Sequence, residues 1–359
     1  MSSAVFIIIG IIAVIILAEI ISRLAYRLYF HLPFQDRRIA EYLYSRFLVE
    51  TDPPVHCIFK KGFRSSEINI NRFGLRGDEP APNGARRRIL VVGESNFFGA
   101  KLQNERHIWS NQLQRLLTTI GHADWEVING GTPLYGSAQH WHFWAGALAE
   151  VRPEIMIVQI GGNDVAQMTL LGEHWHPDAH WPYEFLLKLE KKGTRLNSLL
   201  GRFCLYFFLR RFFEKESAPR FPKGDGELLW EECKRHTLDQ YRKFHSYAMQ
   251  NGIRIVFVGP PLLCDLDLTK KNKRRLYAIQ RNYQNALKSE GPYFFDLKDA
   301  IAHDLCPELD VPYWNLIADL QADPHCFSFW YDMAHWNEKG MSFVARKLYE
   351  RIEKLGWWV

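Results

Sequence analysis

The sequence predicts an α/β protein built around a parallel β-sheet. Short apolar runs that are typical of buried strands alternate with longer amphipathic segments that are typical of helices. The predicted strands are residues 89–92, 126–128, 155–160, 253–258 and 293–295. The predicted helices are residues 109–117, 138–150, 228–250, 271–289 and 338–355. Strands that alternate with helices form βαβ units, and the strands of such units run parallel.

Length and composition agree with this fold class and exclude several others. A chain of 359 residues is long enough for one α/β domain with appendages. With 47% hydrophobic and 24% charged residues, the composition is that of a globular protein and excludes long disordered tracts. The net charge of +5 is too small to indicate a nucleic-acid partner. The six cysteines include no C-x-x-C pair, so neither a zinc knuckle nor a dense disulfide framework is indicated.

The N-terminus departs from the globular pattern. Residues 4–18 form an unbroken apolar run, and Ile20 and Ile21 extend it past Glu19. A run of this length predicts one transmembrane helix. No Lys or Arg precedes the run and no small-x-small site follows it, which argues against a secretory signal peptide. We therefore predict a single-pass anchor at residues 1–22, with membrane lipid as its partner.

The rest of the chain divides into two parts. Residues 23–85 form a stem and lead-in, with an amphipathic helical pattern over 22–50 and turn signals over 71–84. Residues 86–359 carry the strand and helix pattern and form the main domain. About ninety residues separate its third and fourth predicted strands, so we expect an insertion at 165–228.

Polar residues with catalytic chemistry follow the predicted strands. Ser95 comes two residues after Gly93, and Asn163 follows the pair Gly161 and Gly162. Groups just beyond the carboxyl ends of parallel strands gather at one edge of the sheet, where function usually lies. Near the C-terminus, Asp332 stands three residues before His335, and a carboxylate at that spacing can orient an imidazole.

Taken in this order, these motifs resemble those of the SGNH (GDSL-type) hydrolase family. The resemblance covers residues 86–359 without the insertion and implies a three-layer α/β/α sandwich. It implies Ser95 as nucleophile, His335 as general base and then acid, and Asp332 as the group that orients His335. It also implies that the Asn163 amide and the Ser95 backbone N–H form an oxyanion hole. It calls for no cofactor and no metal.

Two positions depart from the family pattern. Glu94 stands where the family usually has Asp, and Leu134 stands where it commonly has the Gly that supplies a third oxyanion N–H. Leu134 can still supply that N–H if its backbone reaches a conformation that normally favours glycine. Otherwise Gly131 or Gly136 would be the donor.

The expected function is that of a membrane-anchored bacterial serine esterase. Its expected substrate is an acylated polysaccharide or small molecule, with acetyl as the acyl group. An O-acyltransferase would share the same acyl-enzyme chemistry, and a lipid or thioester hydrolase is a further alternative. A catalytically silent glycan-binding or assembly protein is the alternative from a different class.

The location of the main domain rests on conflicting signs. Arg23, Arg27, Arg37 and Arg38 follow the anchor, and the positive-inside rule would place them in the cytoplasm. A cell-surface polysaccharide ester would be met outside it. We expect the domain to be extracytoplasmic.

Four other features have competing explanations. The aromatic insertion fits a lid, a membrane contact or core packing. Trp141, Trp144 and Trp336 suit sugar stacking or core packing. Residues 174–180 have metal-ligand types but also suit a solvated loop, and the basic run 270–275 suits a polyanion contact or an exposed helix start.

Overall fold

The computed structural model describes most of the chain. The described residues are 3–30, 47–82, 84–100, 102, 104–177, 203–206, 209, 226–262, 269, 291–330 and 334–358. The predicted helix 271–289, the basic run 270–275, Asp332 and most of the insertion lie outside these residues.

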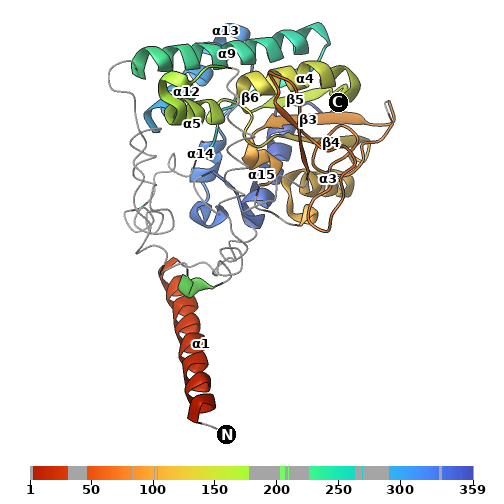
Figure 1. Ribbon diagram of the computed structural model, residues 1–359. Helices are drawn as coiled ribbons and strands as arrows, with labels where there is room; N and C mark the ends of the chain where they lie inside the picture. Colours follow the sequence, from red (N-terminus) through yellow and green to blue (C-terminus); the bar gives the residue numbers. More distant parts are fainter. Residues whose placement is uncertain are drawn as a thin grey trace.

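A five-stranded parallel sheet forms the centre of the domain, in the order β4-β3-β5-β6-β7 (Figure 1). Its strands are β3 (Arg87–Gly93), β4 (Trp125–Gly131), β5 (Ile155–Val158), β6 (Arg254–Val258) and β7 (Tyr313–Trp314). The register places Gly93 beside Gly131 and Val92 beside Val158. The predicted parallel sheet is confirmed, and the carboxyl ends of its strands meet at one edge.

Helices cover both faces of the sheet (Figure 1). On one face lie α3 (Trp109–Thr119) and α15 (Glu338–Lys354). On the other lie α4 (Ser137–Val151), α5 (Gly162–Leu171) and α9 (Gly226–Gln250). Residues of β3 alternate between the two apolar cores, as successive strand side chains must: Ile89 joins the first core and Leu90 the second. The three-layer sandwich is confirmed.

The fifth predicted strand is wrong. Residues 293–295 lie in a helix, α12 (Gly291–Asp299), in which Phe294 and Leu297 are buried while Phe295 is exposed. That spacing of three residues is helical, and a run of three aromatic residues was too short to show it. The fifth strand is β7, whose two residues give no periodic signal.

The remaining described elements connect these layers. They are the π-helix η6 (Ala300–Leu305), α13 (Cys306–Leu309), α14 (Leu316–Gln321) and the 3₁₀-helices η3 (Glu105–His107), η4 (Gly172–His174) and η7 (Cys326–Phe329).

The lead-in packs against the domain. Strand β1 (Leu48–Glu50) pairs antiparallel with β2 (Cys57–Phe59), so the helix predicted over 22–50 is wrong at its end. The hairpin carries Phe59 onto Phe98, with ring centroids 5.1 Å apart, and burial in this apolar cluster outweighs the local helical pattern. Phe98 is the last residue of α2 (Ser95–Phe98).

Arg76 ties the lead-in to the end of α2. Its buried guanidinium pairs with Glu105 at 2.9 Å and donates to the carbonyl oxygens of Gly99 and Leu102, both at 2.8 Å. A buried charge is tolerated because it is paired and hydrogen-bonded in this way.

The N-terminal helix α1 (Ser3–Phe30) stands apart from the sandwich (Figure 1). Within the described part of the chain, it is the one helix that is long and apolar enough to cross a bilayer, over Val5–Leu28. The apolar window of that span is not buried in the protein, whereas Tyr26 near its end is buried. This agrees with a membrane anchor, although a signal sequence has the same features.

Candidate active site

Two residues that are 240 positions apart meet at the carboxyl edge of the sheet. Ser95 begins α2 directly after β3, and His335 lies just before α15. The Ser95 Oγ lies 2.9 Å from the His335 Nε2, which is hydrogen-bond distance. Both side chains are partly exposed, so a substrate can reach them.

Aromatic packing beneath the pair fixes its geometry. Phe97 meets Trp336 edge to face, with centroids 5.2 Å apart, and meets Trp109 in the same way at 5.6 Å. The Trp109 indole N–H also donates to the Phe97 carbonyl at 2.5 Å. All three rings are fully buried. Because Phe97 and Trp336 are near neighbours of Ser95 and His335, their contact brings the two reactive groups together.

Glycine at position 93 permits this packing. A Cβ there would lie 2.7 Å from the Phe97 ring, which is too close for any larger residue without a shift. On the His335 side, Asn337 caps α15 by accepting from the Lys339 and Gly340 backbone N–H groups at 3.0 and 3.2 Å. Asp332, which we expect to orient His335, lies outside the described residues.

The loop after β4 presents Leu134 in an unusual conformation. Its φ of 70° lies in the left-handed region, which favours glycine and is costly for a bulky side chain. The Gln167 side-chain amide donates to the Leu134 carbonyl at 3.0 Å and holds that peptide in place. This conformation satisfies the condition on which Leu134 could replace the family's glycine.

The two alternative oxyanion donors are already engaged. The Gly131 N–H donates to the Asn129 side chain at 3.0 Å, and the Gly136 N–H donates to the Gln139 side chain at 2.9 Å. Within the described residues, the backbone N–H groups of Ser95 and Leu134 donate no hydrogen bond to the protein. Of the candidate backbone donors, these two are therefore the ones available to a substrate.

The first turns of α5 hold the same loop through side chains. The Asn163 amide donates to the Tyr135 carbonyl at 2.9 Å, which uses one of its two hydrogens. The Asp164 carboxylate accepts from the Ser137 N–H at 2.8 Å and from the Ser137 hydroxyl at 2.9 Å. Burial raises the pKa of Asp164 to about 6.

Glu94 connects β3 to α5. Its carboxylate accepts from the Asn163 backbone N–H at 2.7 Å and from the Gln159 amide at 3.2 Å. Burial raises the pKa of Glu94 to about 8, against the lowering effect of these hydrogen bonds. A Cβ on Gly162 would lie 2.5 Å from the carboxylate, so a larger residue at position 162 would have to displace the Glu94 side chain.

Sequence reasoning missed Gln159, Asp164 and Gln167. Asp164 directly follows Asn163, and Gln167 lies one helical turn after Asn163 on the same face of α5. That helical spacing was the available signal for Gln167. Gln159 directly follows a buried strand, as Ser95 and Asn163 nearly do.

Two other interpretations concern tryptophans and residues 174–180, of which 178–180 lie outside the described residues. Trp144 and Trp336 are fully buried and cannot stack on a substrate, while Trp141 packs edge to face on Phe244 at 5.2 Å. The described part of the chain contains no group of three His, Cys, Asp or Glu that could hold a metal ion.

The chain matches no protein-family model and no curated protein. Among solved structures, it is similar to a lipase/acylhydrolase from Enterococcus faecalis, with 11% identity over 75% of this chain and 96% of that chain and a TM-score of 0.42. It is also similar to the acetyl xylan esterase AlAXEase, with 13% identity over 74% and 99% and a TM-score of 0.44. A GDSL-like lipase from Bacteroides thetaiotaomicron has 11% identity over 76% and 91% and a TM-score of 0.42.

Proposed function

We propose that this protein is a serine hydrolase of the SGNH type. Within that class, we propose an esterase that removes a short acyl group, with acetyl expected, from a polysaccharide or small molecule. The observation that carries the proposal is the 2.9 Å contact between the Ser95 Oγ and the His335 Nε2. The candidate donors, which are the N–H groups of Ser95 and Leu134 and the Asn163 amide, follow the neighbouring strands β3, β4 and β5.

The proposed reaction passes through an acyl-enzyme. As the Ser95 Oγ attacks the ester carbonyl carbon, His335 Nε2 accepts the hydroxyl proton. The negative charge that develops on the carbonyl oxygen is stabilised by the donors of Ser95, Leu134 and Asn163. The carbon–oxygen bond to the alcohol then breaks, and His335 gives its proton to the leaving oxygen.

Water completes the proposed cycle. His335 takes a proton from the water molecule as it attacks the acyl carbon, and returns that proton to the Ser95 oxygen when the acid leaves. We propose that Asp332 orients His335 throughout. A sugar hydroxyl in place of water would make the same intermediate an acyl donor, which is the acyltransferase alternative.

We propose that α1 anchors this domain on the extracytoplasmic side of a membrane. The length of α1 and its apolar window, none of which is buried in the protein, support the anchor. The arginines after the span argue against the orientation, and a surface ester substrate argues for it. A phosphatase that works only outside the cytoplasm should be active when it is fused after Val359. An inactive phosphatase, together with an active cytoplasmic reporter fused at the same point, would place the domain in the cytoplasm.

Covalent labelling tests the nucleophile. A serine-directed phosphonate should label the wild-type protein and leave Ser95→Ala unlabelled, and equal labelling of both would exclude Ser95 as the nucleophile.

Ser95→Ala and His335→Ala should each lower kcat by on the order of a million-fold, and the double variant should lose little more because the residues act as a unit. Aryl esters of increasing chain length distinguish a short-chain esterase from a lipid hydrolase, and inactivity on all of them would favour the binding-protein alternative.

A further inference from the structure

Glu19 is a carboxylate within an apolar helix. About 20 helical residues cross the hydrocarbon core of a bilayer, so a span that enters at Val5 leaves near Leu24. Glu19 then lies about five residues short of that exit, or roughly 7 Å inside the core at 1.5 Å per residue. An ionisable residue at such a depth requires a partner.

The partners of Glu19 come from two parts of the chain. Its Oε1 accepts from the Arg23 Nε at 2.6 Å, one turn further along α1, and from the Cys204 backbone N–H at 2.9 Å. Its Oε2 accepts from the Leu205 N–H at 2.8 Å. The Glu19 side chain is 13% exposed, whereas the adjacent Ile20 is 57% exposed. Residues 203–206 of the insertion therefore cover the carboxylate.

These contacts suit an apolar medium. Hydrocarbon offers no hydrogen bonds, so a segment can enter it only if its backbone N–H groups find acceptors in the protein. Glu19 supplies acceptors for two such groups, while the Arg23 guanidinium balances its charge.

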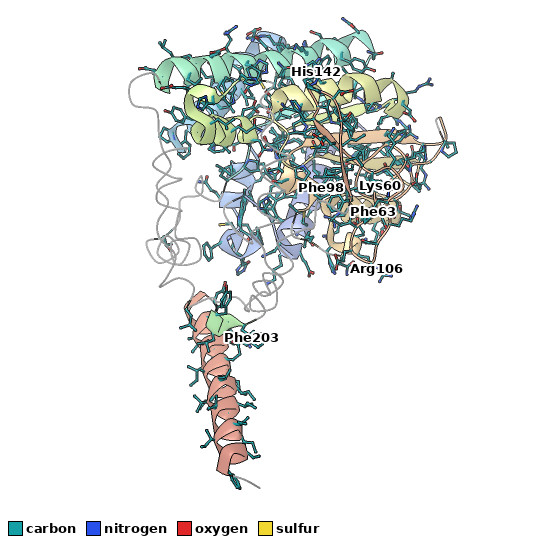
Figure 2. The ribbon with its side chains drawn as sticks, viewed as in Figure 1. Lys60, Phe63, Phe98, Arg106, His142 and Phe203 are labelled. Atoms are coloured by element: carbon teal, nitrogen blue, oxygen red, sulfur yellow. The ribbon has the colours of Figure 1, made fainter. Side chains whose placement is uncertain are left out.

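Apolar side chains extend outward from the same segment. Phe203 is 43% exposed and Leu209 is 48% exposed. Figure 2 shows Phe203 beside the C-terminal end of α1, away from the sheet and its covering helices. The exposed ring of Phe203 therefore lies next to the apolar surface of the membrane helix.

We propose that residues 203–206 dock on Glu19 and form, with α1 and the exposed Leu209, one membrane-contact surface whose partner is the acyl-chain region of the bilayer. Glu19 is the docking residue, and Phe203 and Leu209 contact lipid. The insertion begins within α5, the helix that carries Asn163, so a second membrane contact would hold the domain against the bilayer at two points. This inference rests on the proposed anchor and does not depend on the proposed ester chemistry.

Depth-dependent fluorescence quenching tests the surface. The full-length protein would be placed in phosphatidylcholine vesicles that carry a nitroxide on the acyl chain, with a fluorescent amino acid at one position per variant. A probe at Phe203 or Leu209 should be quenched at least threefold more than a probe at Leu228, an equally apolar residue of α9 that is 76% exposed. A probe at Val14 reports that α1 is in the membrane.

Variants at Glu19 test the docking. Glu19→Leu should lower the quenching at Phe203 toward the Leu228 level while Val14 stays quenched, and Glu19→Gln, which keeps one acceptor oxygen, should fall between. Quenching at Phe203 no greater than at Leu228, with Val14 quenched, would overturn the proposed surface while leaving the anchor standing. A Val14 probe outside the membrane would refute the anchor and the surface together. Aryl acetate hydrolysis measured on the same samples reports the proposed esterase independently.

Discussion

The two sides of the candidate site are held by different forces. Behind Ser95 and His335, three buried aromatic rings pack edge to face, and the Trp109 indole N–H donates to the Phe97 carbonyl. Around Leu134, the loop is held by side-chain hydrogen bonds from Asn163, Asp164 and Gln167 of α5. The first side is an apolar core, and the second is a buried polar network.

This difference has consequences for how each side responds to change. Apolar packing is non-directional and independent of pH, so a defect there costs mainly stability. A polar network places donors with directional bonds and depends on the protonation of its members. We therefore expect changes on the aromatic side to appear in unfolding and changes on the polar side to appear in kcat and in pH dependence.

The largest effect on stability should come from Trp336→Ala. Removing a fully buried Trp side chain leaves a cavity and costs about 3–5 kcal/mol of unfolding free energy. Trp336→Phe, which keeps a ring against Phe97, should lose less. Urea unfolding measures both, and an Ala variant as stable as the wild type would show that the aromatic side does not hold the site.

The largest effect on the polar side should come from Asn163→Ala. Loss of one oxyanion donor should lower kcat by about a hundredfold to a thousandfold, with a much smaller change in stability. Leu134→Ala keeps its backbone N–H and should be mild. Leu134→Pro should approach the Asn163→Ala loss if circular dichroism and melting show an intact fold, because it deletes the donor.

Leu134→Pro also changes φ, so a cleaner variant is needed. Proline fixes φ near about −65°, whereas Leu134 adopts 70°. Replacing Leu134 by its α-hydroxy acid removes the N–H without that constraint and should reproduce the loss in kcat. Full activity of this backbone ester would show that the third donor lies elsewhere.

The polar side should also give stability a pH dependence that Glu94→Gln reduces. The pKa of Glu94 is about 8 in the folded protein and ordinarily 4.5, so between these values the folded state holds a proton that the unfolded state lacks. The free energy of unfolding should then fall as pH rises through this range, by at most about 1.4 kcal/mol per pH unit. Above pH 8 the contribution of Glu94 should end.

Neighbouring groups define the best window for this measurement. The pKa of Asp164 is raised from its ordinary 3.8 to about 6. Asp164 therefore also makes the free energy of unfolding fall with pH, but at lower pH than Glu94 does. Burial lowers the pKa of His140 from 6.5 to about 3. Between these two pH values His140 makes the free energy of unfolding rise with pH, which is opposite to the effect of Glu94. Burial raises the pKa of Tyr241 well above 10, so it stays neutral. Between pH 6.5 and 8, unfolding by urea should show a slope for the wild type and less of one for Glu94→Gln, and equal slopes would contradict the assignment.

The smallest effect should come from Gln167→Ala. Its hydrogen bond to the Leu134 carbonyl is neutral and worth about 1 kcal/mol, which corresponds to about a fivefold loss in kcat. KM should change little because Gln167 positions Leu134 and does not contact substrate. Adding Leu134→Gly should restore part of the loss, since glycine adopts positive φ without the steric cost. An additive double variant would contradict this coupling.

Local patterns predicted much of the fold. Strands β3 to β6 and the described helices α3, α4, α9 and α15 follow from apolar periodicity, because each buries one face or both over several residues. Strand β7 and helix α12 could not be predicted in this way. The two residues of β7 are too few to show a periodic pattern, and the three aromatic residues 293–295 of α12 fit a strand as well as a helix. The hairpin of β1 and β2 did not follow from local patterns either, because its Phe59 packs on Phe98, which is distant in the sequence.

The sequence by itself determined the chemistry that the site could hold: a hydroxyl after the first strand of the sheet, an amide after the third and an imidazole before the last helix. Only the tertiary structure decided that Ser95 and His335 lie within hydrogen-bond distance and that Gln167 holds Leu134 at positive φ. The pairing of Glu19 with residues 203–206, 185 positions away, was decided in the same way. The physical reason is that periodicity and turn chemistry act over a few neighbouring residues, whereas these contacts depend on which distant segments the packed sheet and helices bring together.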